Sequence, residues 1–278
     1  MLKWVQLTGK VAVTLMMAIT ALFIFSLLLS PISPDLGPLP LTVAQNAAFV
    51  LAAYVSWRYM ERRPFTDMGL DPSRWIRPFL HGSTLGLVLI GGLFLLLWLT
   101  PWLEVTGLRP AGLITPGLYS ALLFLIVAFG EEVFTRGYMQ TLLSRSLGSY
   151  RGIFTTAILF SALHLQNPSS TLLPMVNLFL AGVLLGVARH VSGGLWLPIG
   201  IHFTWNWSQD MLSLPVSGLR ISRDSLLTAV ETGPNWITGG AFGLEGGAAV
   251  IPVLLLGTGW LLYRWRSTQN TSGFSDSH

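Results

Sequence analysis

Long apolar runs that contain few charges dominate this sequence and restrict what it can fold into. A helix that crosses the hydrocarbon core of a bilayer needs about 20 mostly apolar residues, and several stretches of this 278-residue chain meet that requirement. Only 10% of the residues are charged, against about 25% in a soluble domain. Because this charge is too scarce to solvate a soluble protein of such length, the sequence predicts an all-α, polytopic membrane protein.

The apolar runs predict about eight transmembrane helices. Their expected positions are residues 11–30, 41–57, 79–100, 117–147, 152–165, 172–190, 194–211 and 247–263. The first run resembles a signal peptide in following basic residues, but it is long and no small-residue cleavage site follows it, which favours a retained anchor. Residues 64–78 are too polar to cross and are expected to form an interfacial connector, and residues 212–246 an extramembrane loop. Small residues at helical spacing, Gly182 and Gly186, are expected to let neighbouring helices approach closely.

The distribution of Lys and Arg indicates the orientation of these helices. With the N-terminus in the cytoplasm, twelve of the 16 basic residues fall on the cytoplasmic side, three fall outside, and Arg136 lies within a span. An odd number of spans would spoil this bias, so we expect both termini in the cytoplasm. The compact layout and the lack of organelle signals favour a prokaryotic plasma membrane.

Two function classes are excluded by composition. The net charge of +4 does not indicate a nucleic-acid partner, because the basic residues lie between apolar runs and form no patch with interleaved aromatics. The chain has no cysteine, which excludes disulfides, thiolate catalysis and zinc held by cysteine.

Charged residues inside the fourth apolar run need an explanation. Glu131, Glu132 and Arg136 all lie there, although a charged side chain at the centre of a membrane helix costs about 2.5–3.5 kcal/mol. Glu132 and Arg136 are at i,i+4 and can pair on one helix face, so a structural ion pair is their simplest interpretation. Glu131 is rotated from Glu132 by about 100°. It needs a partner on another helix, or it has to stay protonated.

Three further polar residues lie in apolar surroundings on other spans. His164 ends the apolar run 160–164, and His202 and Asn206 share one helix face at i,i+4. At a rise of about 1.5 Å per residue, Glu131 and both histidines fall in one slab near mid-membrane. We expect these side chains to converge in a polar cavity, with interhelical hydrogen bonding as the simpler alternative for each.

These residue types are those that peptide hydrolysis requires. A desolvated carboxylate can act as a general base near neutral pH and activate a water molecule. A neighbouring histidine can hold that water or exchange protons with it. A second histidine and an amide supply donors for the oxyanion that forms when a peptide carbonyl is attacked. Glu131, His164, His202 and Asn206 thus make a hydrolytic set without a side-chain nucleophile. The sequence contains no Gly-x-Ser-x-Gly and no His-Glu-x-x-His motif.

These residues occur in three motifs that resemble the ordered motifs of the CAAX-protease and bacteriocin-processing family (CPBP, or Abi), which includes the Ras-converting CAAX endopeptidase of eukaryotes. The motifs are Glu-Glu-Val-Phe-Thr-Arg at 131–136, Phe-x-x-x-His at 160–164 and His-x-x-x-Asn at 202–206. The similarity covers residues 117–210, and each motif lies on a different predicted span. The resemblance implies an intramembrane endopeptidase with its active site in a mid-membrane cavity.

The resemblance also implies roles for single residues. Glu131 is expected to activate the water, with His164 beside it. His202 and Asn206 are expected to form the oxyanion site. Many members of this family are called metalloproteases, and Glu131, His164 and His202 could hold zinc. A metal-free glutamate peptidase is favoured over the zinc enzyme, because asparagine is a poor zinc ligand but suits an oxyanion site.

The remaining motif residues are expected to support the site. Glu132 and Arg136 match positions with a structural or substrate-orienting role, and Phe160 is expected to serve core packing. Two rival functions stay open: a catalytically silent membrane scaffold of the same fold, and a proton-coupled transporter that uses the buried acid. The asparagine at i+4 from a histidine favours the enzyme over the transporter, since a proton relay does not need it.

The expected organisation has three parts. Residues 1–110 hold N-terminal transmembrane helices and the interfacial connector, residues 111–211 the catalytic core, and residues 212–278 the loop, the last helix and a disordered tail. The expected partners are the lipid bilayer and a peptide or membrane-protein substrate, whose identity stays open together with the oligomeric state.

Overall fold

The computed structural model describes residues 2–32, 38–108, 114–221 and 225–272, and this part of the chain is mostly helical. The helices are α1 (Leu2–Leu29), α3 (Leu39–Val55), α4 (Ile76–Leu99), α5 (Ile114–Glu132), α6 (Gln140–Leu147), α7 (Ser149–Leu163), α8 (Leu172–Ser192), α9 (Trp196–Met211), α10 (Asn235–Thr238) and α11 (Val250–Ser272). Two π-helical segments, Ser56–Glu61 and Val133–Met139, continue α3 and join α5 to α6. The predicted domain boundary at 110/111 and the end of the predicted tail, 273–278, lie outside the described residues.

Five helical segments of the described chain are long and apolar enough to cross a membrane. They are Trp4–Leu29, Leu39–Glu61, Ile76–Leu99, Ile114–Leu147 and Leu172–Ser192, and each matches a span predicted from the sequence. The chain is therefore an integral membrane protein.

The other predicted spans are also helices, but they are less suited to crossing a bilayer unaided. α7 has 15 residues and α9 has 16, which corresponds to about 22–24 Å of helix, less than the hydrocarbon core of about 30 Å. α11 is longer but carries Arg264 and Arg266 in its last turns. The total of about eight crossings therefore stays a prediction.

The fourth predicted span is one long helical rod. α5, the π-helical segment and α6 together form a candidate span of 34 residues, Ile114–Leu147, which exceeds the length a bilayer requires and implies tilt or protrusion. The rod ends at Gly148, whose φ of 88° lies in the left-handed region that glycine adopts without strain. The π-helical segment begins one residue after the two glutamates.

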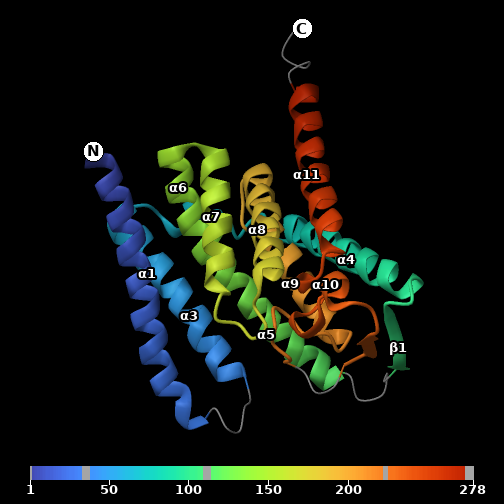
Figure 1. Cartoon of the computed structure of the whole chain (residues 1–278). Coiled ribbons are helices and arrows are strands. Elements are labelled where there is room, and N and C mark those ends of the chain that lie inside the picture. Colours follow the sequence, from blue (N-terminus) through green and yellow to red (C-terminus); the bar gives the residue numbers. More distant parts are fainter. Residues whose placement is uncertain (1, 33–37, 109–113, 222–224, 273–278) are drawn as a thin grey trace.

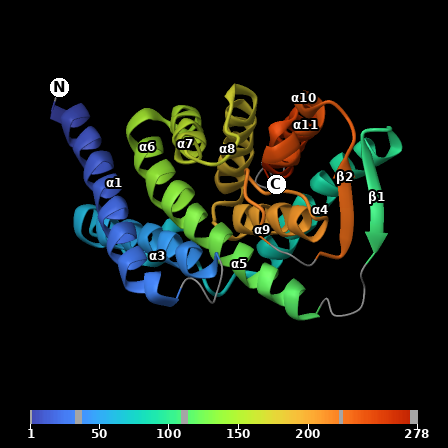
Figure 2. The ribbon, with the colours of Figure 1, turned by 60° about the horizontal axis from the view of Figure 1, so that its bottom comes forward.

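α9 packs between α4 and α5 and also contacts α8. Figure 1 shows α1 and α3 together at one edge of the molecule, and α7, α8 and α11 in succession across it. Figure 2 shows α5 crossing from α3 to α9. Gly182 lets α8 approach α7 closely, because a Cβ there would lie 2.9 Å from the Cα of Ala157.

The segment between α9 and α11 is more structured than a simple extramembrane loop. β2 (Leu227–Glu231) pairs antiparallel with β1 (Leu103–Leu108), a sheet that the sequence analysis did not predict. Short 3-10 helices follow at Gly240–Phe242 and Leu244–Gly246. Because Val216 is buried, this segment folds back onto the helices.

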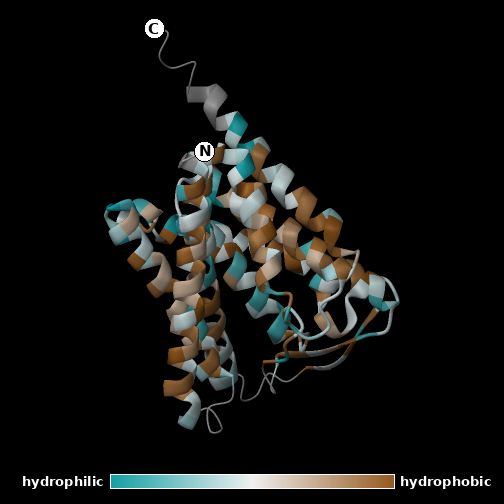
Figure 3. Cartoon of the chain, turned by 60° about the vertical axis from the view of Figure 1, so that its left-hand side comes forward, coloured by the Kyte–Doolittle hydropathy of each residue, from teal (hydrophilic) through white to brown (hydrophobic). Residues whose placement is uncertain are grey.

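Hydrophobic residues make up long stretches of the helices, as the hydropathy colours of Figure 3 show, and many of them are exposed. α1 is the extreme case, since only 11% of its most apolar window is buried inside the protein. Such a surface would be unstable in water and is natural against lipid. The start of α1, the turn between α6 and α7, and the end of α11 lie on the same side of the molecule (Figure 1).

Candidate active site

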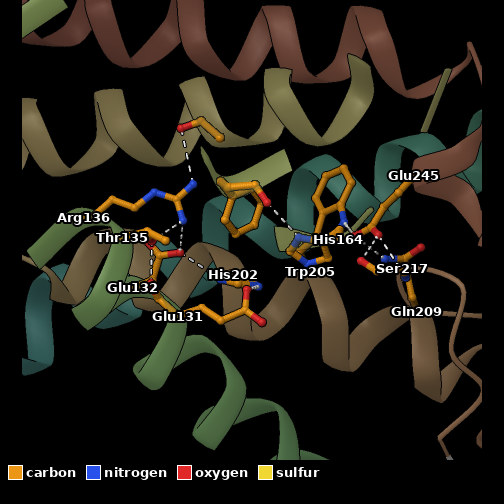
Figure 4. A network of polar contacts seen from close by, with 12 residues as sticks. Glu131, Glu132, Thr135, Arg136, His164, His202, Trp205, Gln209, Ser217 and Glu245 are labelled. Atoms are coloured by element: carbon orange, nitrogen blue, oxygen red, sulfur yellow. Dashed lines mark hydrogen bonds and ion pairs between the residues drawn. The ribbon is translucent and has the colours of Figure 1, made fainter. Parts of the chain in front are cut away.

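One cavity gathers the polar residues that the sequence singled out. Glu131 of α5, His164 at the end of α7, and His202 and Asn206 of α9 all line it. Residues of α3, α8, α11 and the segment after α9 also line it. Its volume is about 140 Å³, which is room for several water molecules. The structure thus brings the four side chains together, three of which are drawn in Figure 4.

A fully buried ion pair forms one side of the site. Nη1 of Arg136 lies 2.7 Å from Oε1 of Glu132, and neither side chain is accessible to solvent. Arg136 also donates to Thr135 Oγ1 at 2.9 Å and to the carbonyl of Gly182 at 3.4 Å. The guanidinium stands 4.2 Å from the centroid of the Phe160 ring. The pairing of Glu132 with Arg136, predicted from their i,i+4 spacing, is present.

Glu131 has a different environment from its neighbour. Glu131 lines the cavity, which Glu132 does not. Its Oε2 atom is buried and, like Oε2 of Glu132, has no hydrogen-bond partner within the described chain. The nearest basic group is Nε2 of His202, 3.9 Å away. Because consecutive helical residues point about 100° apart, Glu131 faces the cavity while Glu132 faces Arg136. A carboxylate with a free acceptor atom in a water-sized cavity is what a general base requires.

His202 connects the two glutamates. Its Nδ1 lies 2.9 Å from Oε1 of Glu132. Since a carboxylate accepts, this contact assigns a proton to Nδ1 and aims Nε2 at the cavity and at Glu131. A second proton, on Nε2, would make the ring a donor toward the cavity, and the charge of Glu132 would compensate it.

His164 is oriented by the backbone of its own helix. Its Nδ1 lies 2.9 Å from the carbonyl oxygen of Phe160. A carbonyl can only accept, so Nδ1 carries a proton, and in the neutral ring Nε2 is then an acceptor. The ring therefore presents a basic nitrogen to the cavity that it lines.

Phe160 packs among the polar groups. Its ring centroid lies 4.9 Å from that of His164 and 6.0 Å from that of His202, and its face receives the Arg136 guanidinium. The Phe160 ring is buried, as its predicted role in core packing requires. Its contacts also hold both imidazoles and the guanidinium in place, as a buried aromatic ring with specific edge and face contacts does.

The structure adds cavity residues that the sequence analysis did not select. Gln45 and Asn46 of α3 line the cavity, as do Ser217 and Glu245 from the segment after α9. Asn46 lies directly against Gly130, where a Cβ would collide with its side chain. A signal for Glu245 existed in the sequence, since it is a lone acid in a glycine-rich, largely apolar stretch.

The donor set for a metal is incomplete in this arrangement. Across residues 2–32, 38–108, 114–221 and 225–272, no three His, Asp or Glu side chains gather closely enough to hold a metal ion. Glu131, His164 and His202 line one cavity without forming such a group. The metal-free reaction stays a prediction.

Sequence comparisons point to the same part of the chain. Residues 113–208 match the family described as "Type II CAAX prenyl endopeptidase Rce1-like". A protein of Escherichia coli described as an "Uncharacterized 24.3 kDa protein" is 38% identical over 82 residues, which is 29% of this chain and 37% of that protein. The "Uncharacterized protein YpbD" of Bacillus subtilis is 33% identical over 81 residues, 29% of this chain and 38% of its own length.

The match thus spans little more than a third of each curated relative. The family match, residues 113–208, contains every residue of the three motifs, from Glu131 to Asn206. The resemblance stated from those motifs is therefore confirmed: residues 113–208 of this chain match the Rce1-like type II CAAX prenyl endopeptidase family.

Proposed function

We propose that this protein is an intramembrane endopeptidase in which Glu131 activates a water molecule for attack on a peptide bond. The observation that carries the proposal is the single cavity that Glu131, His164, His202 and Asn206 line. The match of residues 113–208 to a peptidase family supports it independently. The substrate is a peptide or a membrane-protein segment; a CAAX sequence is one candidate, drawn from the family description alone.

The attack begins with a water held between two acceptors. Oε2 of Glu131 lacks a partner within the described residues, and Nε2 of His164 is the acceptor nitrogen of that ring. A water that donates to both directs its lone pair at the substrate carbonyl. Glu131 takes one proton as the new C–O bond forms. The same proton then passes to the leaving amine nitrogen as the C–N bond breaks.

The oxyanion would be stabilised from α9. Among the described residues, the Asn206 amide has no hydrogen-bond partner, and it lines the cavity one helical turn from His202. Its NH₂ group can donate to the negative oxygen of the tetrahedral intermediate. His202 can donate from Nε2 once it is protonated, because Glu132 accepts from Nδ1 at 2.9 Å and compensates the charge.

The bilayer position of this cavity is part of the proposal. The candidate span Ile114–Leu147 contains Glu131 near its middle, which supports a site within the hydrocarbon region. α1 starts and α11 ends on one side of the molecule (Figure 1), which supports an even number of crossings; the distribution of Lys and Arg favours the cytoplasm for both termini. A prokaryotic plasma membrane remains the proposed location.

The test uses purified protein in detergent or liposomes with a library of quenched fluorescent peptides. Glu131→Gln should lower kcat by at least about 10²-fold, the scale of a lost general base, while the thermal unfolding midpoint is retained. Glu104→Gln is the matched control, since Glu104 is exposed on β1 and should cleave like the parent. Equal cleavage by Glu131→Gln and the parent would refute the mechanism.

The rival functions predict other results. A silent scaffold would cleave no peptide in the library yet would retain peptides in a pull-down that Glu131→Gln does not change. A proton-coupled transporter would acidify liposomes in a substrate-dependent manner and lose that flux in Glu131→Gln. Either result, with no cleavage by the parent, contradicts the peptidase.

A further inference from the structure

Glu245 is a buried carboxylate that the proposed reaction does not use. It lies in the short helix Leu244–Gly246, outside the segment that matches the peptidase family. Its side chain is 7% exposed and lines the same cavity as Glu131. No Lys, Arg or His of the described chain lies within ion-pair distance of it. A buried anion without a cation needs another source of stabilisation.

Four hydrogen-bond donors provide that stabilisation. Oε1 accepts from Nε1 of Trp205 at 2.8 Å and from Nε2 of Gln209 at 3.1 Å. Oε2 accepts from the backbone N–H of Ser217 at 3.0 Å and from its hydroxyl at 2.6 Å. Figure 4 shows this cluster on the far side of His164 from Glu131. Because a carboxylate offers about four lone-pair sites, Glu245 has no free site left for a substrate.

The donors come from α9, which carries the proposed oxyanion groups, and from Ser217, which is hydrogen-bonded to the turn after His164. Trp205 and Gln209 belong to α9 and flank Asn206 on that helix. The Ser217 carbonyl accepts from Nδ2 of Asn167 at 2.9 Å, and Asn167 lies three residues after His164. A chain of hydrogen bonds therefore runs from the turn after His164, through Ser217 and Glu245, to α9.

The backbone of Glu245 is held as firmly as its side chain. Nδ2 of Asn177, on α8, donates to the carbonyls of Glu245 and Gly247 at 2.7 and 2.8 Å. The amide of Gly218 donates to the carbonyl of Phe242 at 2.9 Å. Glu245 is thus held in place by α8, and its carboxylate in turn binds both α9 and the segment at Ser217.

The rotation of α9 about its axis decides where His202 and Asn206 point. With side chains, a helix has a radius of about 5–6 Å, so a rotation of about 10° moves a side-chain tip by about 1 Å. A displacement of about 1 Å at a reacting centre can cost about 10²-fold in rate. Two donors on α9 bound to one buried carboxylate limit that rotation.

We propose that Glu245 is a positioning residue of the active site, which sets the rotation of α9 and ties it to the turn that follows His164. This inference rests on the proposed peptidase function. Glu245 acts through His202 and Asn206 and touches no reacting atom. Its loss should therefore lower kcat and leave the KM for a peptide nearly unchanged.

The principal variant is Glu245→Gln. Its amide oxygen can still accept from Trp205 and Gln209, but its NH₂ group meets the N–H of Ser217, donor against donor. We expect kcat to fall about 10- to 100-fold, with KM within about threefold and the unfolding midpoint nearly retained. Glu231→Gln is the matched control: Glu231 accepts from the amide of Gly240 in the same loop at 2.7 Å and should keep the parent kcat.

Gentler variants decide the matter if Glu245→Gln does not fold. Ser217→Ala and Trp205→Phe each remove one donor, and each should lower kcat several-fold. Because both act on one carboxylate, the double variant should lose less than the product of the single losses. An unchanged kcat in both single variants would overturn the proposal. So would a fall in both kcat and the unfolding midpoint in which the kcat loss of the double variant equals the product of the single losses.

A distance measurement tests, without any substrate, whether Glu245 acts as a clamp, that is, whether its hydrogen bonds hold α9 and the Ser217 segment in place. The chain has no cysteine, so spin labels can be attached through Gln166→Cys and Arg220→Cys, both at exposed positions on either side of the Asn167–Ser217 hydrogen bond. Glu245→Gln should broaden or shift the distance distribution, and Glu231→Gln should not. An unchanged distribution contradicts the clamp, whereas an unchanged peptidase activity in Glu131→Gln contradicts the proposed function instead.

Discussion

Replacing Arg136 by methionine removes the positive half of the buried ion pair and leaves its negative half in place. The pair has a 2.7 Å contact with both side chains fully buried, so Glu132 cannot recover its lost partner from water. Breaking a buried pair on one side costs about 3–5 kcal/mol. For a chain of this size, each kcal/mol lowers the unfolding midpoint by about 2–4 °C. Arg136→Met should therefore lower the midpoint by roughly 6–20 °C.

The double variant separates charge pairing from packing. Arg136→Met combined with Glu132→Gln removes both charges, and the glutamine carbonyl can still accept from Nδ1 of His202, which lies 2.9 Å from Oε1 of Glu132. Replacing both members of a buried pair is often close to neutral, so most of the lost stability should return. The double variant should still cleave peptides more slowly than the parent protein, because His202 loses the negative charge of Glu132 that compensates its second proton.

The assay is thermal unfolding in one detergent, followed by intrinsic fluorescence, with Arg151→Met as the control. Arg151 is exposed at the start of α7 and should shift the midpoint little. The reasoning is refuted if Arg136→Met is no less stable than this control. It is also refuted if the double variant is no more stable than Arg136→Met, since packing of the guanidinium against the Phe160 ring, and not charge, would then dominate.

Four more outcomes are expected. Asn206→Leu should lower kcat by about 10²-fold with KM nearly unchanged, the scale of a lost oxyanion donor; peptide cleavage measures it. Gly182→Val should lower the unfolding midpoint, because even its Cβ lies 2.9 Å from the Cα of Ala157, whereas Gly91→Val, with nothing within 4 Å, should not. Burial raises the pKa of Glu231 in the folded protein. The stability that this carboxyl group contributes is therefore fully present below the ordinary pKa of glutamate and is lost as the pH rises through the raised pKa. Glu231→Gln should remove that loss of stability as the pH rises above the ordinary pKa of glutamate, about 4.3, as unfolding midpoints would show. Under the metal-free proposal, a chelator should leave peptide cleavage unchanged and elemental analysis should find no stoichiometric zinc; loss of activity that zinc restores would contradict it.

The features predicted well from the sequence are those with a local physical signature. Five of the predicted spans coincide with helices long and apolar enough to cross a membrane, because hydropathy over about 20 residues needs no knowledge of the fold. The pairing of Glu132 with Arg136 followed from spacing within one helix. The meeting of His164 and His202 with Glu131 required only the assumption that isolated polar groups in lipid seek one another.

The features missed depend on contacts between distant segments. β1 pairs with β2 across more than a hundred residues, and both strands are short, so no local periodicity marks them. Ser217 and Glu245 reach the cavity because the chain after α9 folds back over it. Composition had marked that stretch only as polar and extramembrane. α7 and α9 stay predicted spans, since their apolar sequence is typical of a span but their length is short for one.

The two adjacent glutamates show how one helix can separate structure from chemistry. Oε1 of Glu132 is bound by Arg136 and His202, and Glu132 is not among the residues that line the cavity. Glu131 lines the cavity, and its buried Oε2 has no hydrogen-bond partner in the part of the chain that the structure describes. A rotation of about 100° between neighbouring residues turns one side chain toward the ion pair and the other into the cavity. Under the proposed mechanism, the carboxylate of Glu132 cannot replace that of Glu131, because it points toward the ion pair and not into the cavity. A variant with Glu131→Gln should therefore stay inactive although Glu132, one residue away, still carries its carboxylate.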